Sequence, residues 1–285
     1  MKIILVPTDF SEPAAHALRY AGGLARRFGA RVRLIYADYF VPPVDFSASA
    51  AVEFALTSDE AADTAKKQLI KLAESVLPSG VAYETRVLID SPVPAIVEET
   101  RSCNADLVVM GTHGRTGFRR LIVGSVTESV MRIVNVPLLA ISPLADERRI
   151  STPSGRIVCA VDGSPESRAA LRACAAFAEA PDAKIVVARC LDTETPQEAA
   201  NEIVRLQQWT PADLVERCQY KLLPADHPAE QVVELAKLVY ADLIAAGCAP
   251  RRTAERIVEH SDCPVLVVNE FVVVRGTATT ELATA

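Results

Sequence analysis

Several features that mark other classes of protein are missing from this 285-residue sequence. Its seven cysteines form no Cys-x-x-Cys pair and its four histidines lack zinc-ligand spacing, so we expect buried, reduced thiols and no structural metal. No apolar run approaches the roughly 20 residues of a membrane span. The opening apolar run is short and is broken by Pro7 and Asp9, which argues against a signal peptide. We therefore expect a cytoplasmic protein with no membrane partner.

An excess of positive charge is also missing. The formal net charge is −6 and the isoelectric point is near 5.4, whereas general binding of nucleic acid depends on Lys and Arg that neutralise phosphates. The sequence predicts no nucleic-acid partner. Hydrophobic residues make up 50% and charged residues 23%, as in globular α/β proteins, and the length is sufficient for two domains.

What the sequence does contain is an internal repeat. Residues 3–37 return as residues 156–190, and in each copy an apolar run ends at an aspartate, Asp9 or Asp162. A turn with Ser and Pro follows and opens a segment of helical periodicity, after which comes a second apolar run. Residues 91–111 match residues 227–247 in the same way, and residues 135–143 and 262–270 each add a closing strand.

Continuous apolar strands separated by helices predict a parallel sheet that is covered on both faces. The expected fold is α/β, with two tandem Rossmann-like domains, each a mostly parallel sheet with helices on both faces. We place the domains at residues 1–145 and 155–274, and we expect residues 275–285 to form a disordered tail. Residues 39–59 are expected to form a mobile loop that leads into a helix from about Asp59 to Val76.

Residues 108–132 carry the clearest sign of chemistry. A buried strand is expected to end at Met110, glycines follow at positions 111, 114 and 117, and Gly124-Ser125-Val126-Thr127 opens a helix. Glycines let the backbone approach a ligand, and a helix start offers unpaired N–H groups to phosphate, with hydroxyl donors from Ser125 and Thr127. Neither the P-loop pattern GxxxxGKS nor the dinucleotide pattern GxGxxG occurs in this segment.

This segment resembles the universal stress protein family, whose ATP-binding members carry Gly, two residues, Gly, nine residues, Gly and then Ser or Thr. Gly111, Gly114, Gly124 and Ser125 have that spacing. The resemblance covers nearly all of residues 1–144 and, more loosely, residues 156–270. It implies a tandem protein that binds ATP together with Mg²⁺, with no metal ligands from protein side chains.

The resemblance also implies the roles of individual residues, and the residues themselves agree with it. Open parallel sheets bind ligands at the carboxyl ends of their strands, where the first copy places its aspartate. Taken singly, a helix-start Ser or Gly is usually only a cap, an aspartate here can be a turn former, and a loop His or Arg is more often only solvated. The implied contacts are Asp9 and the Gly111 backbone at the ribose; Pro7, Thr8, Ala37 and Met110 around the adenine; and Gly114, Gly124, Ser125, Val126 and Thr127 at the phosphates, with His113 and Arg115 in reach.

The second copy lacks the segment that would hold phosphates. From Gly111 to Pro137 is 26 positions, but from Gly247 to Pro264 is 17, and no Gly-Ser cluster follows Gly247. We expect the second domain to bind no ATP and to have a structural role. The resemblance implies that the closing strands of the two domains pair in an internal pseudo-dimer, since family members pair through their last strands. Residues 271–274 are expected to extend that strand or to mediate a homodimer.

The sequence-level hypothesis is a nucleotide-dependent stress or signalling protein without strong catalytic activity, acting on a protein partner. We assign no catalytic residue. A slow ATPase is one alternative, and it would need a positioned water, a metal and charge stabilisation. An adenylyl-transferring enzyme is another, although the HxGH and SGGxDS signatures are missing. A nucleotide-free dimeric scaffold is the third.

Overall fold

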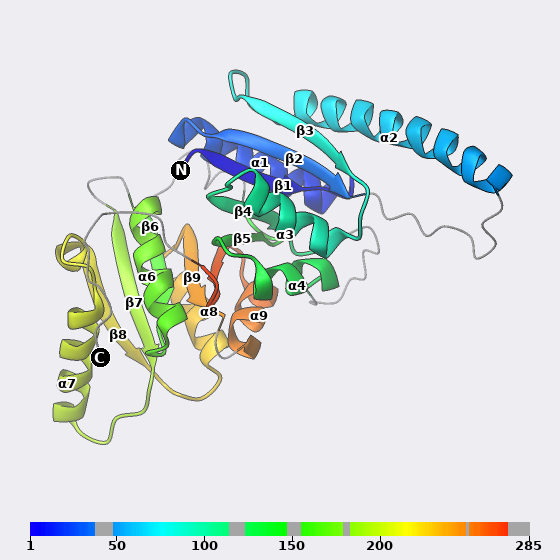
Figure 1. The fold of residues 1–285 in the computed structure, drawn as a ribbon. Coiled ribbons are helices and arrows are strands. Elements are labelled where there is room, and N and C mark those ends of the chain that lie inside the picture. Colours follow the sequence, from blue (N-terminus) through cyan, green and yellow to red (C-terminus); the bar gives the residue numbers. More distant parts are fainter. Residues whose placement is uncertain (38–47, 114–122, 147–154, 179–182, 249–250, 273–285) are drawn as a thin grey trace, which may run out of the picture.

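The computed structural model describes residues 1–37, 48–113, 123–146, 155–178, 183–248 and 251–272 (Figure 1). Gly114, Arg115 and the predicted tail at 275–285 lie outside the described residues. Within the described part of the chain, every helix is too short or too polar to cross a lipid bilayer.

The first half of the chain alternates strands and helices. One expectation for it was wrong: residues 48–58, expected in a loop, belong to α2, which begins at Ala48. The alanines of this stretch favour a helix and no proline follows Pro43 until Pro78, so the helix extends upstream of Asp59. The elements are β1 (Ile3–Pro7), α1 (Glu12–Phe28), β2 (Arg31–Ala37), α2 (Ala48–Val76), β3 (Tyr83–Leu88), α3 (Pro92–Ser102), β4 (Leu107–Gly111), α4 (Ser125–Ile133) and β5 (Leu138–Ile141).

The second half repeats this order. Its last strand ends at Val268, and a turn follows in which Val272 N donates to Asn269 O at 3.2 Å, so Phe271 and Val272 do not extend the strand. The elements are β6 (Arg156–Ala160), α6 (Pro165–Phe177), β7 (Lys184–Cys190), α7 (Pro196–Trp209), the 3₁₀ turn η1 (Val215–Arg217), β8 (Cys218–Leu223), α8 (Pro228–Leu238), β9 (Leu243–Gly247), α9 (Arg251–His260) and β10 (Val265–Val268).

All ten strands form one sheet, in the order β3-β2-β1-β4-β5-β10-β9-β6-β7-β8. Each half is parallel throughout, and the two halves meet where β5 and β10 pair antiparallel, with Leu139 opposite Leu266. The α/β fold and the predicted pairing of the closing strands are thus observed. The pairing joins what would otherwise be two exposed sheet edges.

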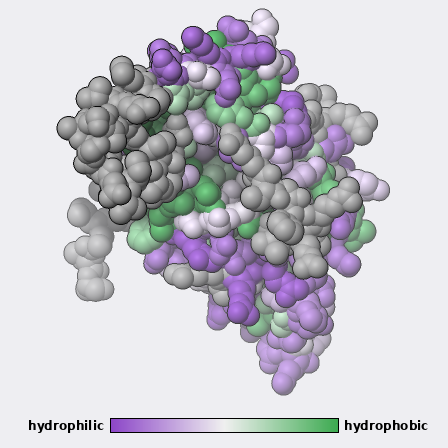
Figure 2. Space-filling view, turned by 90° about the vertical axis from the view of Figure 1, so that its right-hand side faces the viewer, coloured by the Kyte–Doolittle hydropathy of each residue, from purple (hydrophilic) through white to green (hydrophobic). Residues whose placement is uncertain are grey.

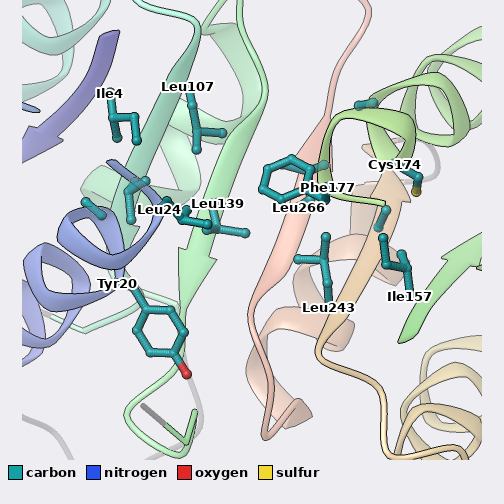
Figure 3. Close-up of a cluster of buried hydrophobic side chains, with 14 of the residues drawn as sticks. Ile4, Tyr20, Leu24, Leu107, Leu139, Ile157, Cys174, Phe177, Leu243 and Leu266 are labelled. Carbon is teal, nitrogen blue, oxygen red and sulfur yellow. The ribbon is translucent and has the colours of Figure 1, made fainter. Parts of the chain in front are cut away.

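Helices cover both faces of this sheet. Leu18 of α1, Leu69 of α2 and Leu171 of α6 are buried against one face, which α7 also covers, and α3, α4, α8 and α9 cover the other. The first face is continuous across the seam: Figure 3 shows side chains from α1 and α6 converging over β5 and β10, and the rings of Phe28 and Phe177 lie 6.1 Å apart. The two domains therefore share one core.

Both copies start their first helix in the same way. The Ser11 hydroxyl accepts a hydrogen bond from Ala14 N at 3.4 Å, and the Ser164 hydroxyl accepts one from Ser167 N at 3.1 Å. Each serine is the N-cap, and a proline lies in the first turn: Pro13 is the second residue of α1 and Pro165 the first of α6. The N–H that proline lacks would have no partner within the helix at either position. The repeat seen in the sequence is therefore a repeat of local structure.

Candidate functional site

The first domain has a cleft at the carboxyl edge of β1, β2 and β4, with a volume of about 250 Å³. Figure 2 looks onto the side of the molecule toward which these strands run in Figure 1, and a hollow bordered by hydrophobic side chains lies near its centre. We call this the first cleft. Of the residues expected at the site, its lining includes Pro7, Thr8, Asp9, Ala37, Met110, Gly111, His113, Gly124, Ser125, Val126 and Thr127.

Four further residues line the first cleft that the sequence analysis did not single out: Ala14, Tyr36, Pro92 and Ile96. Pro92 and Ile96 belong to α3, which follows β3, and β3 pairs with β2 at the same edge of the sheet. A predicted strand order with β3 beside β2 could have pointed to these two residues, because it brings the start of α3 to the same edge of the sheet. Tyr36 precedes Ala37 in β2, and its ring lies 4.8 Å from that of Phe10.

Asp9 sits in a tight turn at the end of β1. Its Oδ1 accepts hydrogen bonds from the backbone N–H of Ser11, at 3.0 Å, and from the Ser11 hydroxyl. Phe10 has a left-handed backbone with φ of 64°, and its N–H donates to Thr8 Oγ1 at 3.0 Å. A non-glycine residue in this region is strained, so the surrounding contacts must hold the turn. The carboxylate of Asp9 is thereby fixed at the cleft.

Gly111 is required by packing against α1. A Cβ at this position would lie 2.7 Å from Pro13 O, which is too close for any side chain. Gly247 repeats the arrangement in the second half, where a Cβ would lie 2.6 Å from Ser167 N. A glycine at the end of this strand is therefore explained by the close approach of the first helix in both copies, independently of a ligand.

The start of α4 faces the first cleft. Gly124 is its N-cap residue and provides no side-chain cap, so the N–H groups of Ser125, Val126 and Thr127 have no acceptor within the helix. Gly124 N itself donates to Thr112 O at 2.7 Å. This leaves a set of N–H groups and the positive end of a helix dipole at the cleft wall, an arrangement that attracts anions.

The hydroxyl groups at this wall differ from one another. Thr127 is buried, and its Oγ1 donates to Gly111 O at 2.8 Å, so its hydrogen is already used within the protein. Ser125 is exposed. His113 is half-buried, and its Nδ1 lies 2.9 Å from Thr112 Oγ1. Ser125 therefore remains as a hydroxyl donor, whereas Thr127 has a structural task.

The second domain supports α4 from behind. Asn269, at the end of β10, donates from Nδ2 to Met131 O at 2.8 Å and to Val134 O at 2.9 Å. Arg132 of α4 pairs with Glu255 of α9 at 2.7 Å. Val123 N donates to the carboxylate of Glu259, whose pKa is raised chiefly by burial. The helix that faces the first cleft is thus fixed by residues of the second half.

The cysteines lie away from the first cleft. Cys159, Cys174, Cys248 and Cys263 are buried, and Cys103, Cys190 and Cys218 are half-buried. Burial raises the pKa of Cys190 and of Cys218 to about 11, and that of Cys103 is raised for the same main reason. These thiols are protonated at neutral pH and are poor nucleophiles.

Fold and site together define a class: a tandem, doubly wound α/β protein with a cleft at its strand ends that opens onto a helix start. The family model described as the universal stress protein family matches residues 1–142 and 153–269. The chain belongs to the universal stress protein family.

Individual relatives agree with this assignment. A universal stress protein of Methanocaldococcus jannaschii is 34% identical over 140 residues, which is 49% of this chain and 81% of that protein. One of Mycobacterium tuberculosis is 28% identical over 195 residues, covering 62% of this chain and 63% of that protein. The crystal structure of a universal stress protein from Archaeoglobus fulgidus aligns over 94% of this chain and 98% of its own with a TM-score of 0.68, at 17% identity, and so reports on the fold alone.

Proposed function

We propose that the first cleft binds ATP together with Mg²⁺, and that the protein acts as a nucleotide-dependent stress or signalling protein rather than as a strong catalyst. The observation that carries this proposal is the start of α4, where three N–H groups face a cleft of about 250 Å³ and the N-cap residue has no side chain to satisfy them. An anionic ligand would supply the missing acceptors.

The shape and chemistry of the cleft support an adenine nucleotide. Ile96 and Met110 provide apolar surface for a base, and Asp9 supplies a carboxylate that would accept hydrogen bonds from ribose hydroxyls. The phosphates would lie at the start of α4, next to Gly124 and Ser125. Asp9 is the one carboxylate among the described lining residues. Mg²⁺ would therefore be held by phosphate oxygens and water, which suits a cation that keeps several waters.

Titration calorimetry with Mg²⁺-ATP tests this proposal, and the repeat provides a matched control. Asp9→Asn should weaken ATP binding by about tenfold, which corresponds to the loss of one charge-assisted hydrogen bond. Asp162→Asn, the same change in the second copy, should leave ATP binding unchanged. No heat at millimolar ATP, or equal losses in the two variants, would contradict the proposal.

Two further measurements separate the alternatives. Absorbance and mass analysis of the freshly purified protein would reveal any adenine nucleotide retained from the cell, which a nucleotide-free scaffold would lack. Release of phosphate from ATP would identify a slow ATPase, and a genuine activity should be lost in Asp9→Asn but retained in Asp162→Asn. The cytoplasmic location stays a prediction for cell fractionation.

A further inference from the structure

The second domain has a cleft of its own in the same position. Its volume is about 170 Å³, and it lies at the carboxyl edge of β6, β7 and β9. We call it the second cleft. Its lining includes Ala160, Asp162, Cys190, Val232, Ala246 and Gly247, which occupy the repeat positions of Pro7, Asp9, Ala37, Ile96, Met110 and Gly111.

The polar end of the second cleft is built as in the first. Asp162 Oδ1 accepts a hydrogen bond from Ser164 N at 2.9 Å, as Asp9 Oδ1 accepts one from Ser11 N at 3.0 Å. The residue after the aspartate is left-handed in both copies, and in the second it is Gly163, with φ of 93°. Asp162 is exposed at the rim of the cleft, so its carboxylate is positioned to accept from hydroxyl groups of a ligand.

The opposite end differs in a way that disfavours phosphate. In the first cleft the lining residues of α4 are its first three, so the end of the helix faces the ligand space. In the second cleft they are Thr253, Ala254 and Ile257 of α9, which begins at Arg251. Ala254 and Ile257 lie beyond the first three residues of α9, so the flank of this helix, with their methyl groups, forms most of the wall where the first cleft has N–H donors. A phosphate would meet mainly apolar atoms there, with Thr253 as the polar exception.

Charge points to the same conclusion. Among the described residues that line the second cleft there is one carboxylate and no Lys, Arg or His. Arg168 and Arg189 lie near the Asp162 turn, but both stack on the ring of Trp209, at 4.2 Å and 5.6 Å, and Arg189 also pairs with buried Glu202. A ligand with phosphates would find no cationic side chain among these lining residues, whereas a neutral ring with hydroxyl donors fits both the walls and Asp162.

We propose that the second cleft binds a neutral nucleoside without phosphates, of the adenosine class. The ligand class rests on the function proposed for the first cleft, because the two share the positions that would face base and ribose. The protein would then have two unlike sites: one for a nucleotide with its phosphates, and one for a nucleoside that has lost them. The two helices that line these sites, α4 and α9, are in contact through the ion pair of Arg132, in the last turn of α4, with Glu255.

Titration calorimetry of the full chain with ATP and with adenosine tests this proposal. ATP should saturate at one site per chain, and adenosine should still bind one site when ATP is present at saturation. Ala160→Phe places a ring in the second cleft from a half-exposed strand end and should weaken that remaining adenosine binding by at least about tenfold, with ATP binding unchanged. Asp162→Asn tests the polar end of the second cleft with a smaller change, and it should also weaken the adenosine binding that remains in the presence of ATP.

The outcomes separate this proposal from the one on the first cleft. If ATP fails to bind but adenosine binds and is lost in Ala160→Phe, the first proposal falls and this one stands. If ATP-saturated protein takes up no adenosine, or if ATP fills two sites, this proposal is overturned. A further, independent measurement uses the unmutated chain. Because Cys190 lines the second cleft, bound adenosine should protect its thiol from an alkylating reagent. Failure of saturating adenosine to slow that alkylation would also overturn it.

Discussion

The hydroxyl of Thr127 donates a hydrogen bond of 2.8 Å to the carbonyl oxygen of Gly111. This bond joins the first turn of α4 to the end of β4, across the segment that lies outside the described residues. It fixes the distance between the two sides of the first cleft. Pro13 of α1 packs closely against the same glycine, so β4, α1 and α4 meet at Gly111.

Thr127→Val should loosen this junction. Valine has nearly the same shape as threonine but cannot donate, so the Gly111 carbonyl would lose its partner in a buried position at a cost of about 1–3 kcal/mol in the free energy of unfolding. ATP affinity should fall with it. Urea unfolding and calorimetry measure the two effects. Thr127→Ser keeps the hydroxyl and is the control, and a loss in Thr127→Ser as large as in Thr127→Val would show that the bond is not the cause.

Gly111→Ala and Gly247→Ala should both destabilise the protein strongly. Each new Cβ would lie within 2.7 Å of backbone atoms of the adjacent helix, so a helix must shift, and we expect losses above about 2 kcal/mol. Gly80→Ala is the control because its φ is 85° but nothing lies within 4 Å of the new Cβ. It should lose only the roughly 1 kcal/mol of an unfavourable backbone conformation. Equal losses at the three positions would contradict the packing argument.

Asn269→Leu should weaken the attachment of α4 to the second domain. The side chain is buried, and its Nδ2 satisfies the carbonyl groups of Met131 and Val134. Leaving both carbonyls unpaired should lower the free energy of unfolding by about 2–4 kcal/mol. Asn201→Leu, at an exposed position of α7, should change it by less than about 0.5 kcal/mol. If the two variants unfold at the same urea concentration, Asn269 does not stabilise the junction.

Glu259→Gln should change how stability depends on pH. Burial, aided by the charge of Glu255, raises the pKa of Glu259 above its ordinary value of 4.5, against the opposing effects of His260, Val123 N–H and Arg256. The folded state therefore binds the proton more tightly than the unfolded chain, and stability falls as the pH rises from the unfolded pKa through the folded one. Glutamine keeps an oxygen for Val123 N–H but does not titrate.

Unfolding in urea at several pH values between about 4 and 8 tests this sign. The free energy of unfolding of Glu259→Gln relative to the unmutated chain should increase with pH across that window and then level off. A difference that stays constant, or that decreases, would contradict the burial of Glu259 against Val123.

Alkylation of Cys190 should be slow at neutral pH. Burial, with a smaller effect of the Asp226 charge, raises its pKa to about 11. Only the thiolate reacts, so the rate should rise about tenfold for each pH unit between pH 7 and pH 10. Peptide mass spectrometry after iodoacetamide treatment measures this at Cys190 itself. A rate that levels off near pH 9, as for an unperturbed thiol, would show that the side chain is more open than the structure indicates.

The repeat made much of this molecule predictable. Short-range patterns predicted the strand before Asp9, its counterpart before Asp162 and the serine-capped helices after them, because strands and caps depend mainly on nearby residues. The start of α2 was missed because a stretch with several Ser and Ala residues suits both a loop and a helix, and contacts beyond the sequence neighbourhood decide between them. Pro92 and Ile96 were missed for another reason: the order of the strands in the sheet brings α3 to the first cleft, and the sequence analysis did not predict that order.

By itself, the sequence determined the duplication and the α/β class, which follow from local periodicity. The pairing of the closing strands and most positions of the first cleft were implied by the resemblance to the family, which the glycine spacing carried. Only the tertiary structure decided that Thr127 bonds to Gly111 instead of remaining free, that Gly111 and Gly247 are required by helix packing, and that the flank of α9 closes the second cleft. These features depend on which atoms meet across long chain separations. A nine-residue deletion is visible in the sequence, but the cleft that remains beside it is visible only in three dimensions.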